Sequence, residues 1–376
     1  MHFDESIVFD KEEKEMKEVV DLTQDLIRFK SVHANQVKIR KCADFIESYL
    51  GRNEIPYRRM DHEGLPSILA GSRSGDAPVL LMSHIDVVDG PDALFNPRIE
   101  GEILYGRGSI DDKYAAAVSL VLLKEHTVRL KKAGKNQEQA KFSVLITGDE
   151  EIGGHNGAKK MLAHVNPDFC IALDGGNVAE IITKEKGLFT LKLTAHGIAA
   201  HGSRPWMGKN AIENLIGDFA EIKNFFSLDS EDHWHRTMSL NIIHAGNSFN
   251  QVPDFAEAVF DIRYTEHDDM DALLEEIRPK ISGTLSVVAR EPLFISGESP
   301  FIRLLQEVSP ESRLTFEHGA SDARFLSEVG IPAVVWGADG DQSAHSADEH
   351  VHIPSIYRLY GRLAAFMEKV DAAKER

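Results

Sequence analysis

Four short apolar runs stand out along the chain, and each is too short for a helix and lacks the alternation of a half-exposed strand. Runs of this kind are typical of strands that are buried on both faces. They lie at 78–82, 142–146, 169–173 and 332–336. A helical pattern at 112–130 separates two of them, and two amphipathic segments precede the first run. This alternation predicts an α/β fold with a mostly parallel sheet flanked by helices.

The middle of the chain has a different pattern. Apolar and polar residues alternate over 187–195, which indicates a strand with one buried face. A helix (210–226), two strands (237–245 and 255–264), another helix (268–281) and a final strand (285–289) are predicted to follow. The order β-α-β-β-α-β is that of a ferredoxin-like unit. We therefore expect an α+β lid domain at 187–296, inserted into a catalytic domain made of 1–186 and 297–376.

Charge and cysteine content narrow the class of protein. The 376 residues include 42 Lys and Arg against 60 Asp and Glu, a formal charge of −18. Such an acidic chain repels nucleic acid and anionic lipid, so neither partner is expected, although bound cations would neutralise part of the charge. Cys42 and Cys170 are too few for a disulfide framework or a thiolate zinc cluster. Because no signal peptide or membrane span is evident either, a cytoplasmic location is expected.

Histidines and carboxylates come within a few residues of the first three apolar runs and in the segment beyond the fourth. In chain order they are His84 and Asp86, Glu150 and Glu151, Asp174, and His345. Ligands of open α/β sheets bind beyond the carboxyl ends of the strands. Each residue alone has an ordinary explanation, such as a surface hydrogen bond, a solvated acidic pair or a turn. Their joint placement at one edge of a sheet is what predicts a site.

These residue types suit a divalent metal. Imidazole nitrogen and carboxylate oxygen are ligands of zinc, cobalt and manganese. Two histidines and several carboxylates exceed what a single tetrahedral zinc needs, so two metal ions sharing a bridging carboxylate are expected. Asp111, in the glycine-rich segment 106–113, is the candidate bridge. Taken alone, that segment is more typical of a helix N-cap followed by an acidic first turn.

The same motifs resemble the signature of the co-catalytic zinc peptidase family M20. The matching segments are 83–86, 106–113, 148–151, Asp174 and 344–349. Succinyl-diaminopimelate desuccinylase, acetylornithine deacetylase, glutamate carboxypeptidase, dipeptidases and aminoacylase belong to this family. The resemblance runs from about Leu22 to the C-terminal helix, and the family's fold is a parallel sheet with an inserted lid domain.

The resemblance implies a role for each residue of the site. The implied metal ligands are His84 and Asp174 for the first ion, Asp111 as the bridge, and Glu151 and His345 for the second ion. Glu150 resembles the general base, and Asp86 resembles the acid that holds the ring of His84. The peptide bond after Asp111 is often cis in the family. Zinc is the expected metal, with cobalt or manganese as alternatives.

Further matches lie in and beside the lid domain. His201, in the segment 197–205, resembles the histidine that crosses a dimer interface to polarise the substrate carbonyl, so a homodimer through the lid is implied. Asn250 and Arg263 resemble residues that bind a substrate carboxylate, although a salt bridge at a strand end also explains Arg263. Ser321 lies in a segment that resembles the glycine-rich substrate loop. Ala320 stands there where glycine is common, which leaves the contacts of that loop open.

Together these features predict a metal-dependent hydrolase that cleaves the amide bond of an N-acyl amino acid or a short peptide with a free carboxylate. A dimetal-bound hydroxide is the expected nucleophile, with Glu150 as its base. A dipeptidase or aminopeptidase of the same family is the first alternative, and a non-catalytic binding protein that kept the fold is the second. The branch of the family that uses a cysteine near the metals is disfavoured, because neither Cys42 nor Cys170 lies in a ligand motif.

Overall fold

The computed structural model describes residues 5–72 and 75–374, and the chain divides into two compact units. The first unit holds the described residues up to Lys184 together with 295–316 and the chain from Ser321 onward. The second unit consists of 185–294 and 317–320. Each unit is described by itself below.

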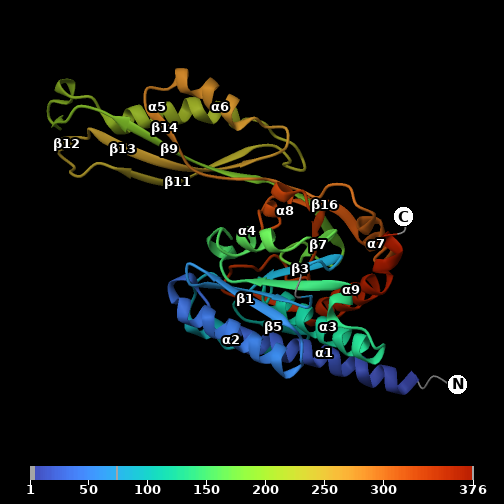
Figure 1. The fold of residues 1–376 in the computed structure, drawn as a ribbon. Coiled ribbons are helices and arrows are strands. Elements are labelled where there is room, and N and C mark those ends of the chain that lie inside the picture. Colours follow the sequence, from blue (N-terminus) through green and yellow to red (C-terminus); the bar gives the residue numbers. More distant parts are fainter. Residues whose placement is uncertain (1–4, 73–74, 375–376) are drawn as a thin grey trace. The chain divides into compact units, whose positions relative to one another are not determined.

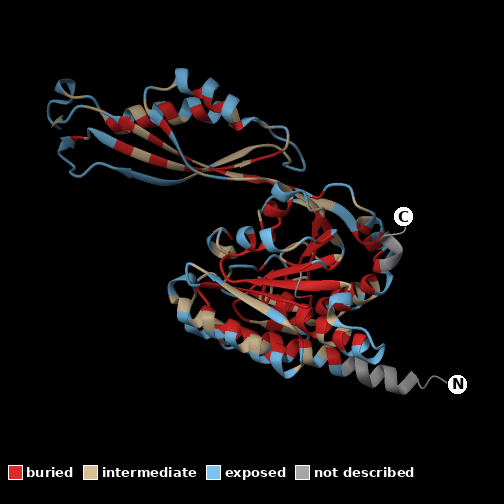
Figure 2. Ribbon diagram, in the orientation of Figure 1, coloured by how far each residue is buried: buried red, intermediate tan, exposed pale blue. Residues whose placement is uncertain are grey.

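The central sheet of the first unit is built on the four apolar runs (Figure 1). They form adjacent strands in the order β6-β3-β7-β17, and each neighbouring pair is parallel. The bounds are Phe142–Thr147 (β6), Val79–His84 (β3), Phe169–Ala172 (β7) and Ala333–Val335 (β17). All four strands are buried along their whole length (Figure 2). The predicted α/β class and parallel centre are confirmed.

Strands that the sequence did not predict extend this sheet on both sides. They are β1 (Tyr57–His62), β2 (Leu65–Ala70), β8 (Glu180–Glu185), β15 (Phe294–Ile295) and β16 (Arg313–Glu317). β1 and β2 form a hairpin whose turn places Glu63 and Gly64 at φ 50° and 78°. Positive φ at both central residues matches the right-handed twist of paired strands. Because β1 is polar and the turn carries glutamate at its first position, the usual sequence signals of a hairpin are weak here.

Helices cover both faces of the sheet. In Figure 1, α1 (Glu5–Ile27), α2 (Gln36–Arg52) and α3 (Lys113–Lys132) lie on one side, and α4 (Ala158–Met161) and α8 (Arg324–Val329) lie on the other. α7 (Pro300–Val308) and α9 (Ile353–Lys374) also belong to this unit. α3 is buried on most of its surface because α1, α9 and strands β3 and β6 pack around it. The loop before α3 is therefore held on a rigid support.

A small antiparallel sheet also belongs to the first unit. Its strand order is β18-β5-β4, with bounds His350–His352, Ile103–Tyr105 and Arg98–Glu100. Among the described residues, no helix combines the length and apolar character that a membrane crossing requires.

The second unit contains an antiparallel sheet in the order β11-β13-β9-β14. The strands span Thr237–Ala245, Phe255–Tyr264, Gly187–His196 and Thr284–Glu291. The helices α5 (Ala211–Lys223) and α6 (Met270–Ile277) contribute buried residues to the same core as the sheet. β9 and β13 alternate buried and partly exposed residues, since only one face packs on the helices. The element and strand orders are those of the predicted ferredoxin-like fold, and the predicted helices end three to four residues earlier than expected, each followed by a 3₁₀ turn.

Candidate metal centre

The candidate ligands come from the carboxyl ends of the central strands, as in other open α/β sheets. His84 is the last residue of β3, and Glu151 lies in a 3₁₀ turn (Glu150–Ile152) just beyond β6. Asp174 follows β7, and His345 lies in the long loop after β17. Asp111 lies in the loop before α3, and its peptide bond to the next residue is cis. Five residues spread over more than 250 positions thus reach one edge of the sheet.

Asp111 faces both histidines. Its Oδ1 lies 2.9 Å from His84 Nε2, and its Oδ2 lies 2.9 Å from His345 Nε2. Asp174 Oδ2 is 3.8 Å from His84 Nε2, and Glu151 Oε2 is 3.2 Å from His345 Nε2. The donors therefore form two groups, His84–Asp111–Asp174 and Asp111–Glu151–His345, and in each group the ligand atoms lie within 4.8 Å of one another. The structure brings together all five residues predicted as ligands, with Asp111 common to both groups.

The ring of His84 is oriented by Asp86. Nδ1 lies 3.0 Å from the main-chain oxygen of Asp86 and 3.5 Å from its carboxylate, so the Nδ1–H donates to the carbonyl and Nε2 faces Asp111. The Asp86 carboxylate instead accepts hydrogen bonds from the main-chain N–H groups of Glu150 and Glu151, at 3.1 and 3.0 Å. Asp86 thus connects the end of β3 to the turn beyond β6, a contact that the sequence did not predict.

Burial and mutual repulsion perturb the titration of the carboxyl groups. Burial raises the pKa of Glu150 well above its usual value, and the charge of Asp174 adds to this effect. Burial would also raise the pKa of Asp111, but the two neighbouring imidazoles reverse this and hold it below its usual range. Hydrogen bonds to Asp111 and Glu151 raise the pKa of His345 to about 10. The site is thus a dense anionic cluster that favours positive charge at its histidines.

A buried ion pair joins the loops that carry Asp111 and His345. Glu349 accepts from Arg107 Nη1 and, at 2.7 Å, from the N–H of Gly108. Arg107 Nη2 also donates to the main-chain oxygen of His345, at 3.2 Å. The side chains of Arg107 and Glu349 are 4% and 0% exposed. Both residues lie in the motifs that identified the site, but no spacing rule pairs residues 242 positions apart.

Glu150 lines a small pocket with His84, Asp174 and Ser321. Asp322 also lines this pocket, which the sequence did not predict. Burial raises the pKa of its carboxyl group to about 7, although the charge of Arg324 acts in the opposite direction. Arg324 donates to the main-chain oxygens of Ser321 and Gly153, at 2.6 and 2.8 Å. These bonds fix the Ser321 loop against the turn that follows Glu150. Asp322 and Arg324 could have been proposed from the sequence only because they stand close to Ser321.

The remaining candidates, His201, Asn250 and Arg263, belong to the second unit. His201 and Asn250 are neighbours, because strand β10 (Ala200–His201) pairs with β12 (Gln251–Val252) and the N–H of Gly202 donates to the main-chain oxygen of Asn250 at 2.6 Å. The guanidinium of Arg263 forms a salt bridge with Asp261, at 2.9 Å. This is the alternative explanation that the sequence left open for Arg263.

The donor set fits a pair of divalent cations. The buried Nε2 of His84 makes no hydrogen bond of acceptable geometry, although carboxylate oxygens surround it. Two imidazole nitrogens with three carboxylates are ligands of zinc, cobalt or manganese. Positive charge between these groups would remove the repulsion that raises the pKa of Glu150.

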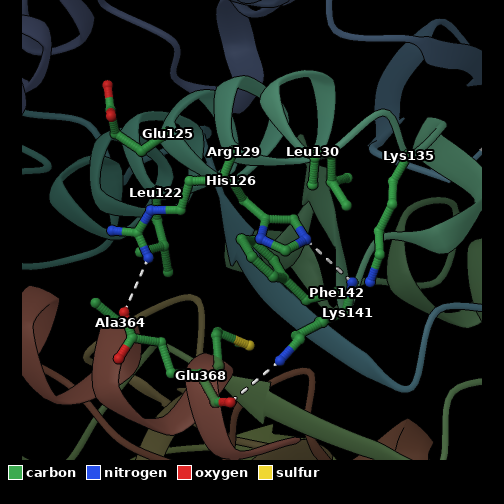
Figure 3. A pocket seen from close by; sticks show the side chains of 12 residues that line it. Leu122, Glu125, His126, Arg129, Leu130, Lys135, Lys141, Phe142, Ala364 and Glu368 are labelled. Atoms are coloured by element: carbon green, nitrogen blue, oxygen red, sulfur yellow. Dashed lines mark hydrogen bonds and ion pairs between the residues drawn. The ribbon is translucent and has the colours of Figure 1, made fainter. Parts of the chain in front are cut away.

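A separate pocket of about 240 Å³ lies between α3, the start of β6 and α9 (Figure 3). Several of its polar side chains pair with each other or with the backbone. Arg129 Nη1 lies 3.0 Å from Glu368, Lys141 Nζ donates to the main-chain oxygen of Glu368, and His126 accepts from the N–H of Lys141. No polar groups converge there on a common point, so this pocket is not the candidate site.

Known proteins resemble this chain over most of its length. A [LysW]-lysine/[LysW]-ornithine hydrolase of Saccharolobus islandicus is 26% identical over 75% of this chain and 78% of its own length. A succinyl-diaminopimelate desuccinylase of Ehrlichia ruminantium is 26% identical over 93% of this chain and 97% of its own. The M20 family metallo-carboxypeptidase Sso-CP2 of Sulfolobus solfataricus has the same fold, with a TM-score of 0.74 and 18% identity over 94% of this chain and 99% of its own.

The family profile described as peptidase family M20/M25/M40 matches residues 80–369, a range that includes all five candidate ligands and most of both units. Together with the two ligand groups that share Asp111, this match shows that the chain is a hydrolase of the peptidase and deacylase type and belongs to peptidase family M20/M25/M40.

Proposed function

We propose that this chain cleaves the amide bond of an N-acyl amino acid or a short peptide with a free carboxylate, using two divalent metal ions, preferably zinc, and Glu150 as general base. The observation that carries the proposal is the position of Asp111, whose two carboxylate oxygens each lie 2.9 Å from a different histidine. A carboxylate placed in this way can bridge two cations. The names of the relatives support the substrate class, since they are a desuccinylase, a hydrolase of lysine and ornithine conjugates, and a carboxypeptidase.

His84 and Asp174 would hold one ion, Glu151 and His345 the other, and Asp111 both. When bound, such a pair acidifies a water molecule and polarises the substrate carbonyl. Glu150 lines the same pocket as His84 and Asp174 and is not assigned to an ion, so its carboxylate is available to accept a proton. Burial raises its pKa, and the bound cations would oppose that shift. It would accept the proton of the attacking water and deliver it to the leaving amine. Asp86 keeps Glu150 and Glu151 in position through their N–H groups.

His201 is suited to stabilise the developing negative charge on the carbonyl oxygen. Its Nδ1 accepts a hydrogen bond from the N–H of Ser203, at 3.1 Å, so a neutral ring carries its proton on Nε2. Nε2–H is the donor that an oxyanion requires. Asn250, which lies beside His201 and accepts from the N–H of Gly202, and Arg263 would bind the substrate carboxylate. For Arg263 this requires giving up its salt bridge with Asp261. Ser321 would contact the substrate in the pocket of Glu150.

We also propose that the chain forms a homodimer through its second unit, with His201 acting in the partner's site. β11 is an edge strand of its sheet, and Ile242 and Ile243 on it are 46% and 54% exposed. An exposed apolar edge strand favours pairing with a second copy. We further propose that the protein is located in the cytoplasm.

The decisive variant is Glu150→Gln, which keeps the size of the side chain and removes the base. Turnover should fall by about 10²–10⁴-fold while the metal content of the protein stays unchanged. Glu102→Gln, at a solvated position outside the site, is the matched control and should behave as the wild type. An active Glu150→Gln protein would refute the assignment of the base.

The substrate class is tested with N-acetyl- and N-succinyl-amino acids beside unblocked dipeptides, each with zinc, cobalt and manganese. Cleavage of unblocked dipeptides alone would favour the dipeptidase alternative, and no cleavage at all would favour a binding protein. Mixing His201→Ala protein with Glu150→Gln protein should restore activity if His201 acts across a dimer. No recovery would place His201 in the site of its own subunit.

A further inference from the structure

A second group of metal-binding side chains lies in the first unit and shares no residue with the candidate centre. It consists of His350 and His352, two residues apart on β18, and Asp341 from the loop before that strand. Both Nε2 atoms approach the same oxygen, since Asp341 Oδ2 is 2.9 Å from His352 and 3.3 Å from His350. The two rings lie 5.6 Å apart and nearly perpendicular, at 82°.

The hydrogen bonds of His350 leave one of its ring nitrogens facing Asp341. Its Nδ1 lies 2.8 Å from the main-chain oxygen of Asp348, so the Nδ1–H donates to that carbonyl. In a neutral ring, Nε2 then directs a lone pair toward the carboxylate oxygen of Asp341, and two lone pairs repel each other. A cation between the two atoms removes this repulsion, and so does a second proton on the ring.

Metal-binding histidines typically donate their other ring N–H to a main-chain carbonyl or a carboxylate, which fixes the ring and its tautomer. His84 in the candidate centre makes the same kind of bond to the main-chain oxygen of Asp86. Two imidazole nitrogens and one carboxylate oxygen are ligands of zinc and its neighbours among the transition metals, rather than of calcium or magnesium.

The ligands are also held in place. β18 pairs with β5, where His350 faces Tyr105 and His352 faces Ile103. Ser343 Oγ accepts from the N–H of His350, at 3.0 Å, and donates to its carbonyl, at 3.1 Å. Sites on strands keep their ligands in place more accurately than sites on loops alone. Only Asp341 comes from the loop itself, where it adopts φ 53°.

Asp341 and His350 stand at the two ends of the segment that contains His345. A cation bound to both would close this segment at its base, in addition to the bond between Arg107 and the His345 carbonyl. We propose that Asp341, His350 and His352 form a third transition-metal site, of the zinc type, that fixes the loop carrying His345. This site does not depend on the proposed reaction.

The test measures bound zinc per chain after equilibration with Zn²⁺ and removal of the excess by gel filtration. His352→Gln should hold one zinc fewer than the wild type. His352 is 31% exposed and the variant keeps an uncharged polar side chain, so it should fold. In an Asp111→Ala background, which removes the bridge of the main centre, the further change His352→Gln should again remove one zinc.

The matched control is His233→Gln. It changes one histidine of the group Asp229, His233 and His235, in which Asp229 and His233 are 3.9 Å apart and 89% and 67% exposed. This variant should keep the zinc that His352→Gln loses. In Asp111→Ala protein, zinc should also slow amide exchange over 341–350, and His352→Gln should abolish that effect. If the wild type and His352→Gln bind equal amounts of zinc, the proposal is wrong and the group is only an ion pair. A loss of zinc in His233→Gln would also overturn the proposal.

Discussion

Asp86 offers the most direct test of how the candidate centre is assembled. Its carboxylate is 1% exposed and accepts two main-chain hydrogen bonds, from Glu150 at 3.1 Å and from Glu151 at 3.0 Å. In Asp86→Asn, the remaining oxygen can still accept one of these hydrogen bonds. The NH₂ group that replaces the other oxygen is a donor, so it cannot accept from the second main-chain N–H. One charge-assisted hydrogen bond is therefore lost and one buried donor is left unsatisfied.

The size of the effect follows from that loss. A hydrogen bond to a charged group contributes about 1.5–3 kcal/mol. If the free energy that holds the Glu151 turn in its binding position falls by this amount, metal affinity should fall by about 10–100-fold. That is the range found when residues that support metal ligands are replaced. The two estimates agree, since a tenfold change in affinity corresponds to about 1.4 kcal/mol.

Competition between the protein and a chelator of known affinity measures this change for Zn²⁺. Asp92→Asn is the control, because it removes the same charge at a residue that is 91% exposed and paired with Lys30. Exposed pairs contribute about 0–1 kcal/mol, so this variant should bind zinc like the wild type. Zinc affinity within twofold of the wild type in Asp86→Asn would refute the reasoning. An equal loss in both variants would show that only net charge matters.

Three further changes test the packing around the site. Glu349→Gln should lower the free energy of unfolding by about 3–5 kcal/mol, because it leaves the buried guanidinium of Arg107 without a counter-charge; a loss below about 1 kcal/mol in urea would contradict this. Leu123→Ala, at a fully buried position of α3, should cost about 2–5 kcal/mol in the same assay. Burial raises the pKa of the Cys42 thiol to about 11 and that of Cys170 further, so neither should react with a thiol reagent at pH 8 until the protein unfolds, and reaction in the native protein would argue against the packing.

The sequence predicted the four central strands of the first unit because their residues face a single environment. β3, β6, β7 and β17 are buried on both faces, so their apolar runs are unbroken and visible. β1 and β8 carry mixed patterns, because they lie toward the edges of the sheet and are partly exposed. Periodicity cannot separate such strands from loops.

The candidate ligands were predictable for a related reason. Parallel strands aim their carboxyl ends at one edge, so residues that directly follow such strands meet whatever loops intervene. Asp111 was the exception, since it precedes a helix and fits an N-cap as well. The structure resolves this ambiguity, because Asp112 occupies the N-cap position of α3 and Asp111 faces the two histidines.

The contacts that support the ligands follow a different logic and were not predictable. Asp86 binds main-chain N–H groups, Arg107 binds a main-chain oxygen, and Arg324 binds two of them. A main-chain partner has no side-chain identity, so no residue type in the sequence marks where the other half of the contact lies. The same holds for the Nδ1 bonds of His84 and His350, which decide the direction of each Nε2 lone pair. For these two histidines the direction of the Nε2 lone pair is therefore set by a carbonyl group two residues away, and only the folded backbone shows where that carbonyl points.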